Sequence, residues 1–229
     1  MQRFVRVMMM MVLLAAVGLS NVALAGGGSS KPTDETAETE TRTPEQEAAV
    51  AYNLGISARN KAWKLEKQLE TATEPKQQEK LDKKLSKSWK TAEANFERAV
   101  SKNPTLYEAH SDLGYCLRKQ GRYDEALAAY DRALEIQPRY AEAIEYRAEA
   151  YLGLNRLDEA KQAYMLLFKG QSDQAPPLLE AMQQWVEAHS ANPGNAAGAD
   201  IEAFSAWVTE RVEIADQTKS VSQLKDADW

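Results

Sequence analysis

The side chains that most often perform chemistry are few in this chain. Its 229 residues include two histidines, His110 and His189, and one cysteine, Cys116. Acid–base and nucleophilic catalysis need such groups within hydrogen-bond reach of a second functional group. The sequence holds no motif for a catalytic triad, a zinc protease or a phosphate-binding loop. It therefore predicts a protein that is not an enzyme and that binds neither a cofactor nor a metal.

Three acidic residues have a spacing that suits recognition. Glu142, Glu145 and Glu149 are separated by three and four positions, so a helix would place them on one face. Such a row could contact a partner, or it could be a solvated helix face. Cys116 lies among small residues that suit helix packing, so we expect a buried and inert thiol.

The elements that would position these residues recur along the chain. Ala92, Ala126 and Ala160 are 34 residues apart, and an aromatic residue follows each of them by four positions. These aromatic residues are Phe96, Tyr130 and Tyr164. A fixed period of this length indicates an array of helix pairs, in which each pair completes the core of its neighbour.

The middle copy, residues 107–140, resembles the tetratricopeptide repeat. The family positions that it retains are Leu113, Gly114, Leu117, Ala126, Tyr130, Ala133 and Pro138, and the third copy retains Tyr151, Ala160 and Tyr164. His110 stands where the family often has Trp. The resemblance implies an all-α fold, a right-handed solenoid of antiparallel helix pairs with small residues at the seams and aromatic residues between units.

The first unit is longer than the others. Leu54-Gly55 repeats Leu113-Gly114, but the matching Ala92 comes 25 residues later than the period requires. The extra residues favour helix, with one turn before Pro75. We therefore predict an elongated hairpin with helices at about 44–70 and 76–102. The predicted units are 44–106, 107–140 and 141–170 for three repeats, 171–216 for C-terminal capping helices and 217–229 for a flexible tail.

The N-terminus has the pattern of a secretory signal peptide. Two arginines precede a short apolar run, and Ala23-Leu24-Ala25 provides a cleavage site. An uncleaved anchor is the alternative, although the run is short for a transmembrane span. We expect a signal peptide at residues 1–25 and a flexible linker at 26–43, whose small, polar and acidic composition disfavours a core. The protein would then be exported, and a bacterial periplasm is the favoured location.

The resemblance also implies a place for a partner. In this family the inner, concave wall is built from the first helix of each pair, so a protein or peptide would bind in a groove there. The candidate partner-binding residues are Tyr115, Arg118, Lys119, Glu142, Glu145, Tyr146 and Glu149. The family's Lys and Asn pattern for clamping C-terminal carboxylates is not evident, and a solvated face remains the alternative for each residue.

Charge is divided unevenly along the chain. Residues 56–90 contain ten Lys or Arg and five Asp or Glu, whereas residues 91–229 contain 14 and 23. The basic hairpin could therefore bind an acidic partner, or its lysines could simply solvate it and pair with nearby Glu residues. We expect neither nucleic acid nor stable membrane insertion.

Two functions follow from this reading. The first is a non-catalytic exported scaffold that binds another envelope protein. The second is a structural module that assembles with copies of itself, through Trp63 and Trp89 if both are exposed.

Overall fold

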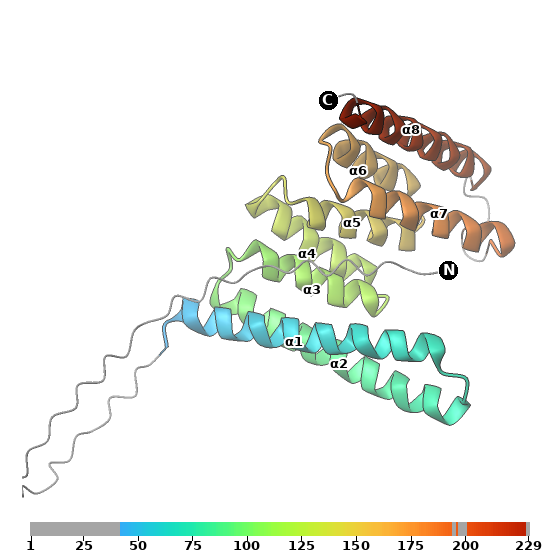
Figure 1. Ribbon diagram of the computed structural model, residues 1–229. Coiled ribbons are helices and arrows are strands. Elements are labelled where there is room, and N and C mark those ends of the chain that lie inside the picture. Colours follow the sequence, from blue (N-terminus) through green and yellow to red (C-terminus); the bar gives the residue numbers. More distant parts are fainter. Residues whose placement is uncertain (1–41, 194–195, 197–200, 228–229) are drawn as a thin grey trace, which may run out of the picture. The chain divides into compact units, whose positions relative to one another are not determined.

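The computed structural model describes residues 42–193, 196 and 201–227, with side chains described as far as residue 218 (Figure 1). These residues belong to one compact unit whose eight long elements are all α-helices, and no strand occurs among the described residues. The expected all-α fold is confirmed. The helices are α1 (Pro44–Thr71), α2 (Pro75–Lys102), α3 (Tyr107–Lys119), α4 (Tyr123–Ile136), α5 (Ala141–Gly153), α6 (Leu157–Lys169), α7 (Ala175–Ala191) and α8 (Ile201–Ala227).

The start of α1 is determined by a capping box. The Thr43 hydroxyl accepts a hydrogen bond from the Gln46 backbone N–H at 3.3 Å, and the Thr43 N–H donates to Gln46 Oε1 at 2.9 Å. Pro44 occupies the first turn, where a missing N–H costs nothing. These interactions satisfy backbone donors that have no partner inside the helix.

The first helix pair is an elongated hairpin. Helices α1 and α2 contain 28 residues each, whereas α3 to α6 contain 13 or 14. At 1.5 Å per residue, the long helices extend about 42 Å and pass the ends of α3 and α4 (Figure 1). Their ends lie within one residue of those expected from the sequence, because Pro44 and Pro75 each begin a helix.

In each of the first two helix pairs, a glycine of the first helix lies against an aromatic ring of the second. A Cβ atom added to Gly114 of α3 would lie 2.7 Å from the Tyr130 ring of α4, and one added to Gly55 of α1 would lie 2.5 Å from the Phe96 ring of α2. Both rings are fully buried. Because only glycine leaves room for the ring at each position, the hairpin of α1 and α2 packs as a repeat despite its insertion.

The other repeat positions occupy the seams to different degrees. Ala126, Ala133 and Ala160 are fully buried, and Tyr164 is 1% exposed. Leu117 is also buried, Leu113 and Tyr151 are half-buried, and Pro138, which follows the end of α4, is exposed.

Helices α7 and α8 cap the last repeat. Trp185 of α7 donates from Nε1 to the Leu152 carbonyl of α5 at 2.9 Å. The Phe204 ring of α8 packs edge-on against Trp185 at 5.3 Å between centroids, and Trp207 packs against Tyr164 of α6 at 5.6 Å. The expected C-terminal cap is confirmed, because these residues cover the apolar face of α5 and α6.

The expected flexible tail at 217–229 needs correction. Helix α8 continues to Ala227 and does not end near residue 216. The physical reason is that no Gly or Pro occurs between Ile201 and Trp229, so nothing in the chain ends the helix. The expected signal peptide, and the linker up to residue 41, lie outside the described residues. Among the helices that are described, none is both long and apolar enough to cross a membrane.

Candidate functional site

Tyr115 of α3 is the centre of an aromatic cluster that joins four helices. Its ring lies 5.8 Å from those of Trp63 in α1 and Trp89 in α2, and 5.0 Å from that of Tyr146 in α5. The Tyr115 hydroxyl accepts a hydrogen bond from Trp63 Nε1 at 2.9 Å. Burial raises the pKa of Tyr115 to about 12. The phenol is thus a neutral, oriented side chain and is not a base.

Arg118 joins α3 to α5. Its guanidinium forms an ion pair with Glu149 and lies 5.0 Å from the Tyr115 ring centre and 5.7 Å from that of Tyr146. The two charged side chains are only 13% and 24% exposed. Arg can stack on aromatic rings while it pairs with a carboxylate, so this cluster holds α3 and α5 in a fixed position relative to each other.

A second ion pair joins α1 to α3 in the same way. Arg59 pairs with Asp112, which is 7% exposed, and stacks 4.5 Å from the centre of the Trp63 ring. Burial raises the pKa of Asp112, although the Arg59 charge acts in the opposite direction. Arg59 follows Gly55 by four residues, as Arg118 follows Gly114. Neither Arg59 nor Asp112 was predicted from the sequence, although the position that Arg59 shares with Arg118 is a signal that could have revealed Arg59.

Lys119 lies at the edge of the aromatic cluster around Tyr115. Its ammonium pairs with Glu66 of α1 at 2.9 Å and lies 5.9 Å from the centre of the Trp89 ring. The residue itself is exposed. It therefore remains accessible to a partner while the hairpin orients it.

The row of three acidic residues on α5 is divided among three environments. Glu149 is paired with Arg118, and Glu142 is half-buried. Glu145 is only 5% exposed and makes no hydrogen bond or ion pair with the residues that the structure describes. Burial and the neighbouring Glu149 raise the pKa of Glu145 to about 8, against the effect of Arg118. The carboxyl is therefore largely protonated at neutral pH.

We call the joined surface of α1, α3 and α5 the inner-helix face, defined by Trp63, Tyr115, Arg118, Tyr146 and Glu149. It contains four of the seven expected partner-binding residues, Tyr115, Arg118, Tyr146 and Glu149, and Lys119 lies at its edge. Glu142 lies on the same helix as Glu149, and Glu145 is withdrawn into the packing. The arrangement offers aromatic rings and oriented charges, the side-chain types that dominate binding hot spots.

The groups that could perform chemistry are occupied or buried. Cys116 is fully buried, and burial raises the pKa of its thiol. Nε2 of His110 lies 3.0 Å from the Pro104 carbonyl oxygen, and Nδ1 of His189 lies 2.8 Å from that of Trp185. Within the described part of the chain, no three His, Cys, Asp or Glu side chains are grouped to bind a metal ion.

Self-assembly through the hairpin tryptophans would require both to be exposed, and neither is. Trp89 is 3% exposed, and Trp63 is half-buried with its N–H bonded to Tyr115. Both rings pack toward α3, because the hairpin needs an apolar face to contact the next repeat. Self-assembly through these two rings therefore loses its structural basis.

Comparison with known proteins agrees with this architecture. The tetratricopeptide repeat family profile matches residues 107–140. The mouse protein O-mannosyl-transferase TMTC2 is 35% identical over 71 residues, which are 30% of this chain and 8% of that protein. The chain thus spans less than a tenth of that relative.

Two solved structures are among those found to be similar to this chain. One is the TPR2B domain of yeast Sti1 in complex with pHsp70, which is 13% identical to this chain with a TM-score of 0.38. The match covers 72% of this chain and 98% of that one. The second TPR domain of human RPAP3, bound to an HSP70 peptide, is 19% identical, with coverage of 57% and 95% and a TM-score of 0.40. The profile match, the 34-residue period and the glycine–aromatic contacts together identify residues 107–140 as a tetratricopeptide repeat.

Proposed function

We propose that this protein is a non-catalytic, exported adaptor that binds a protein or peptide of the cell envelope along its inner-helix face. Tetratricopeptide arrays are scaffolds whose stacked helices form extended binding surfaces. Export rests on the signal-peptide pattern of residues 1–25, and a periplasmic location fits that pattern best.

The observation that supports binding at this face is the cluster of Tyr115, Arg118 and Glu149. Aromatic and Arg side chains dominate binding hot spots, and here they are held by contacts across α3 and α5. A partner would not have to immobilise them on binding, so little conformational entropy would be lost. Cationic Lys119 and acidic Glu142 flank the cluster and would orient a partner with charges of both signs.

A charge swap can test this proposal without leaving a buried charge unpaired. Arg118→Glu with Glu149→Arg retains the ion pair but reverses its polarity. The control is Arg132→Glu with Glu135→Arg, an exposed pair on α4 with 49% and 64% exposure. Both variants should unfold at nearly the temperature of the unaltered protein, which differential scanning calorimetry would verify.

Affinity capture from envelope extract should then separate the two variants. The inner-face swap should lose a partner that the unaltered protein and the α4 swap both retain. If a folded inner-face swap captured the same proteins as the control, this face would not be the binding site.

A further inference from the structure

Helix α2 has a row of lysines that the packing of the fold does not use. Its members are Lys76, Lys80, Lys83, Lys84, Lys87 and Lys90. They recur every three or four residues, so they lie along one face of the helix. Arg98 continues the row toward the C-terminal end of α2. We call these residues the lysine face.

The lysine face points away from the core. At 100° per residue, its members cluster on the side of α2 opposite the buried residues Leu81, Trp89 and Phe96. Trp89 and Phe96 pack in one cluster with Ala62 of α1 and Cys116 of α3. All six lysines and Arg98 are exposed. The row from Lys76 to Arg98 is about 33 Å long at 1.5 Å per residue.

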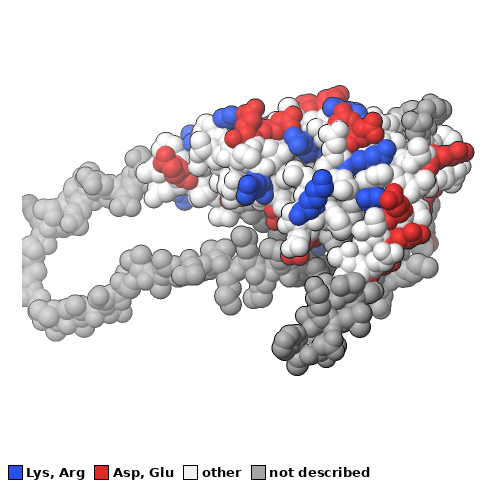
Figure 2. Space-filling model, turned by 90° about the horizontal axis from the view of Figure 1, so that it is seen from above, with Lys and Arg blue, Asp and Glu red and all other residues white. Residues whose placement is uncertain are grey.

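Few of these charges are neutralised inside the protein. Lys83 pairs with Glu79 at 2.6 Å, but the two side chains are 74% and 66% exposed, so the pair is weak. No ion pair joins the other five lysines to a residue that the structure describes. By contrast, basic and acidic side chains lie next to one another on the face drawn in Figure 2.

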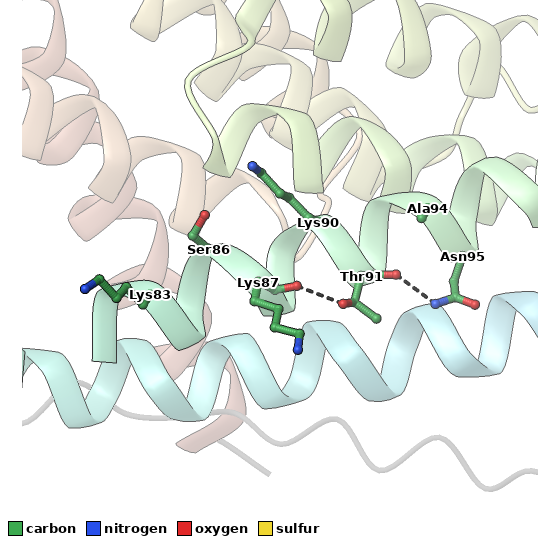
Figure 3. A pocket seen from close by; sticks show the side chains of 7 residues that line it. All are labelled: Lys83, Ser86, Lys87, Lys90, Thr91, Ala94 and Asn95. Carbon is green, nitrogen blue, oxygen red and sulfur yellow. Dashed lines mark hydrogen bonds between the residues drawn. The ribbon is translucent and has the colours of Figure 1, made fainter. Parts of the chain in front are cut away.

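The surface along this row is an open strip. Figure 3 shows a shallow hollow bordered by Lys83, Lys87 and Lys90 together with small and polar residues, all of them on α2. Thr91 donates its hydroxyl to the Lys87 carbonyl at 2.8 Å, and Asn95 donates to the Thr91 carbonyl at 2.7 Å. These polar side chains are thus bonded to their own helix, and the ammonium groups are what the strip offers to a partner.

The composition of the strip discriminates between kinds of anionic partner. It contains no aromatic and no large apolar side chain, and therefore lacks the anchors on which specific protein interfaces depend. Six of its seven cations are Lys, whereas Arg is the residue suited to bidentate contacts with phosphates and bases. A straight row of flexible ammonium groups needs only a flat, diffuse negative charge, which a bilayer with anionic lipids provides.

We propose that the lysine face of α2 binds the surface of membranes that contain anionic lipids, by charge alone and without insertion. Residues 91–229 have an excess of acidic side chains, 23 against 14 basic ones. The same membrane charge that attracts α2 therefore repels the later repeats. The hairpin would lie on the bilayer while the inner-helix face remains available to a partner.

The test uses the chain without residues 1–25, because their apolar run would itself enter lipid and because they lie outside the described unit. Vesicles of phosphatidylcholine with about one third phosphatidylglycerol are compared with phosphatidylcholine alone by co-sedimentation at low salt. The variant Lys83→Gln/Lys87→Gln/Lys90→Gln removes three members of the row. The control Arg132→Gln/Arg139→Gln/Lys169→Gln removes three exposed charges elsewhere.

The unaltered protein should bind the anionic vesicles only, and raising the salt to about 0.5 M should release it. The lysine-face variant should bind at least about tenfold more weakly, and the control within about twofold of the unaltered protein. Absence of binding, or an equal loss in both variants, would overturn the proposal. Stronger binding to polyglutamate or to duplex DNA than to vesicles at the same salt would also overturn it, by assigning the face to an acidic protein or a nucleic acid.

This inference stands independently of the adaptor function. The inner-face swap of Arg118 and Glu149 should leave vesicle binding unchanged, and the lysine-face variant should still capture the adaptor's partner. Each proposal can therefore fail while the other holds.

Discussion

The ring of Phe96 occupies the space that a side chain on Gly55 would need. A Cβ atom there would lie 2.5 Å from Cε1 of Phe96, closer than real Cβ contacts allow. Tyr130 and Gly114 repeat the relationship at 2.7 Å in the next helix pair. The 25-residue insertion thus lengthens the first hairpin but leaves its repeat packing in place.

Gly55→Ala should destabilise the protein, although alanine favours helix more than glycine does. The added methyl group must displace the Phe96 ring, and overpacking of this kind costs about 1–3 kcal/mol. Urea unfolding would measure the change. The double variant Gly55→Ala/Phe96→Leu should lose less free energy of unfolding than the two single variants lose in total. Strict additivity would contradict the predicted clash.

The Arg118–Glu149 pair should contribute more to stability than an exposed pair does. A double-mutant cycle with alanine at both positions should give a coupling of about 1–3 kcal/mol, because the two groups are partly buried. The same cycle on the exposed Arg132 and Glu135 should give about 0.2–0.5 kcal/mol. Equal couplings would show that the inner pair is as solvent-screened as the outer one.

Glu145 should make stability decrease as the pH rises. Its folded-state pKa is about 8 and its ordinary value is 4.5, so the folded protein holds this proton more tightly than the unfolded chain does. Stability from Glu145 is present below about pH 4.5 and is lost as the pH rises through 8. Glu145→Gln should therefore stabilise the protein at pH 8 by roughly 1–3 kcal/mol.

The matching experiment compares urea unfolding of Glu145→Gln and the unaltered protein at both ends of this range. The two free energies of unfolding should be nearly equal in acid and should diverge toward pH 8. Glu135→Gln, on the exposed side of α4, should show no such divergence from the unaltered protein. A constant difference at all pH values would exclude a titrating carboxyl at position 145.

Cys116 should react with a thiol reagent only when the protein unfolds. The side chain is fully buried and its pKa is raised by burial, so little thiolate is accessible in the folded state. Labelling with a chromogenic disulfide should be slow in buffer and rapid in concentrated urea. Rapid labelling of the folded protein would contradict the packing of α3 against the hairpin.

The repeat framework and the hairpin were predictable because they depend on local rules. The period of Ala92, Ala126 and Ala160 reveals the repeat, and Pro44 and Pro75 mark the helix starts. The helical extent of α8 was missed because the absence of a breaker is a weaker sign than its presence.

The charge network was less accessible to sequence reasoning. Arg59 and Asp112 are 53 residues apart. Because the insertion changes the sequence separation between the first two units, spacing alone could not show that these two side chains pair. Burial of Glu145 depends on how α5 packs in three dimensions. The spacing of Glu145 and Glu149 indicated that they share a helix face, but it could not show which of the two would form an ion pair with Arg118.

Contact of a partner with the inner-helix face can be detected by site-specific photo-crosslinking in living cells. A crosslinker would replace Glu142, half-buried on α5, and in a second strain Glu135, exposed on α4. We expect a covalent adduct with one defined protein from position 142 and none from position 135. An adduct from position 135 with none from position 142 would contradict contact at the inner-helix face.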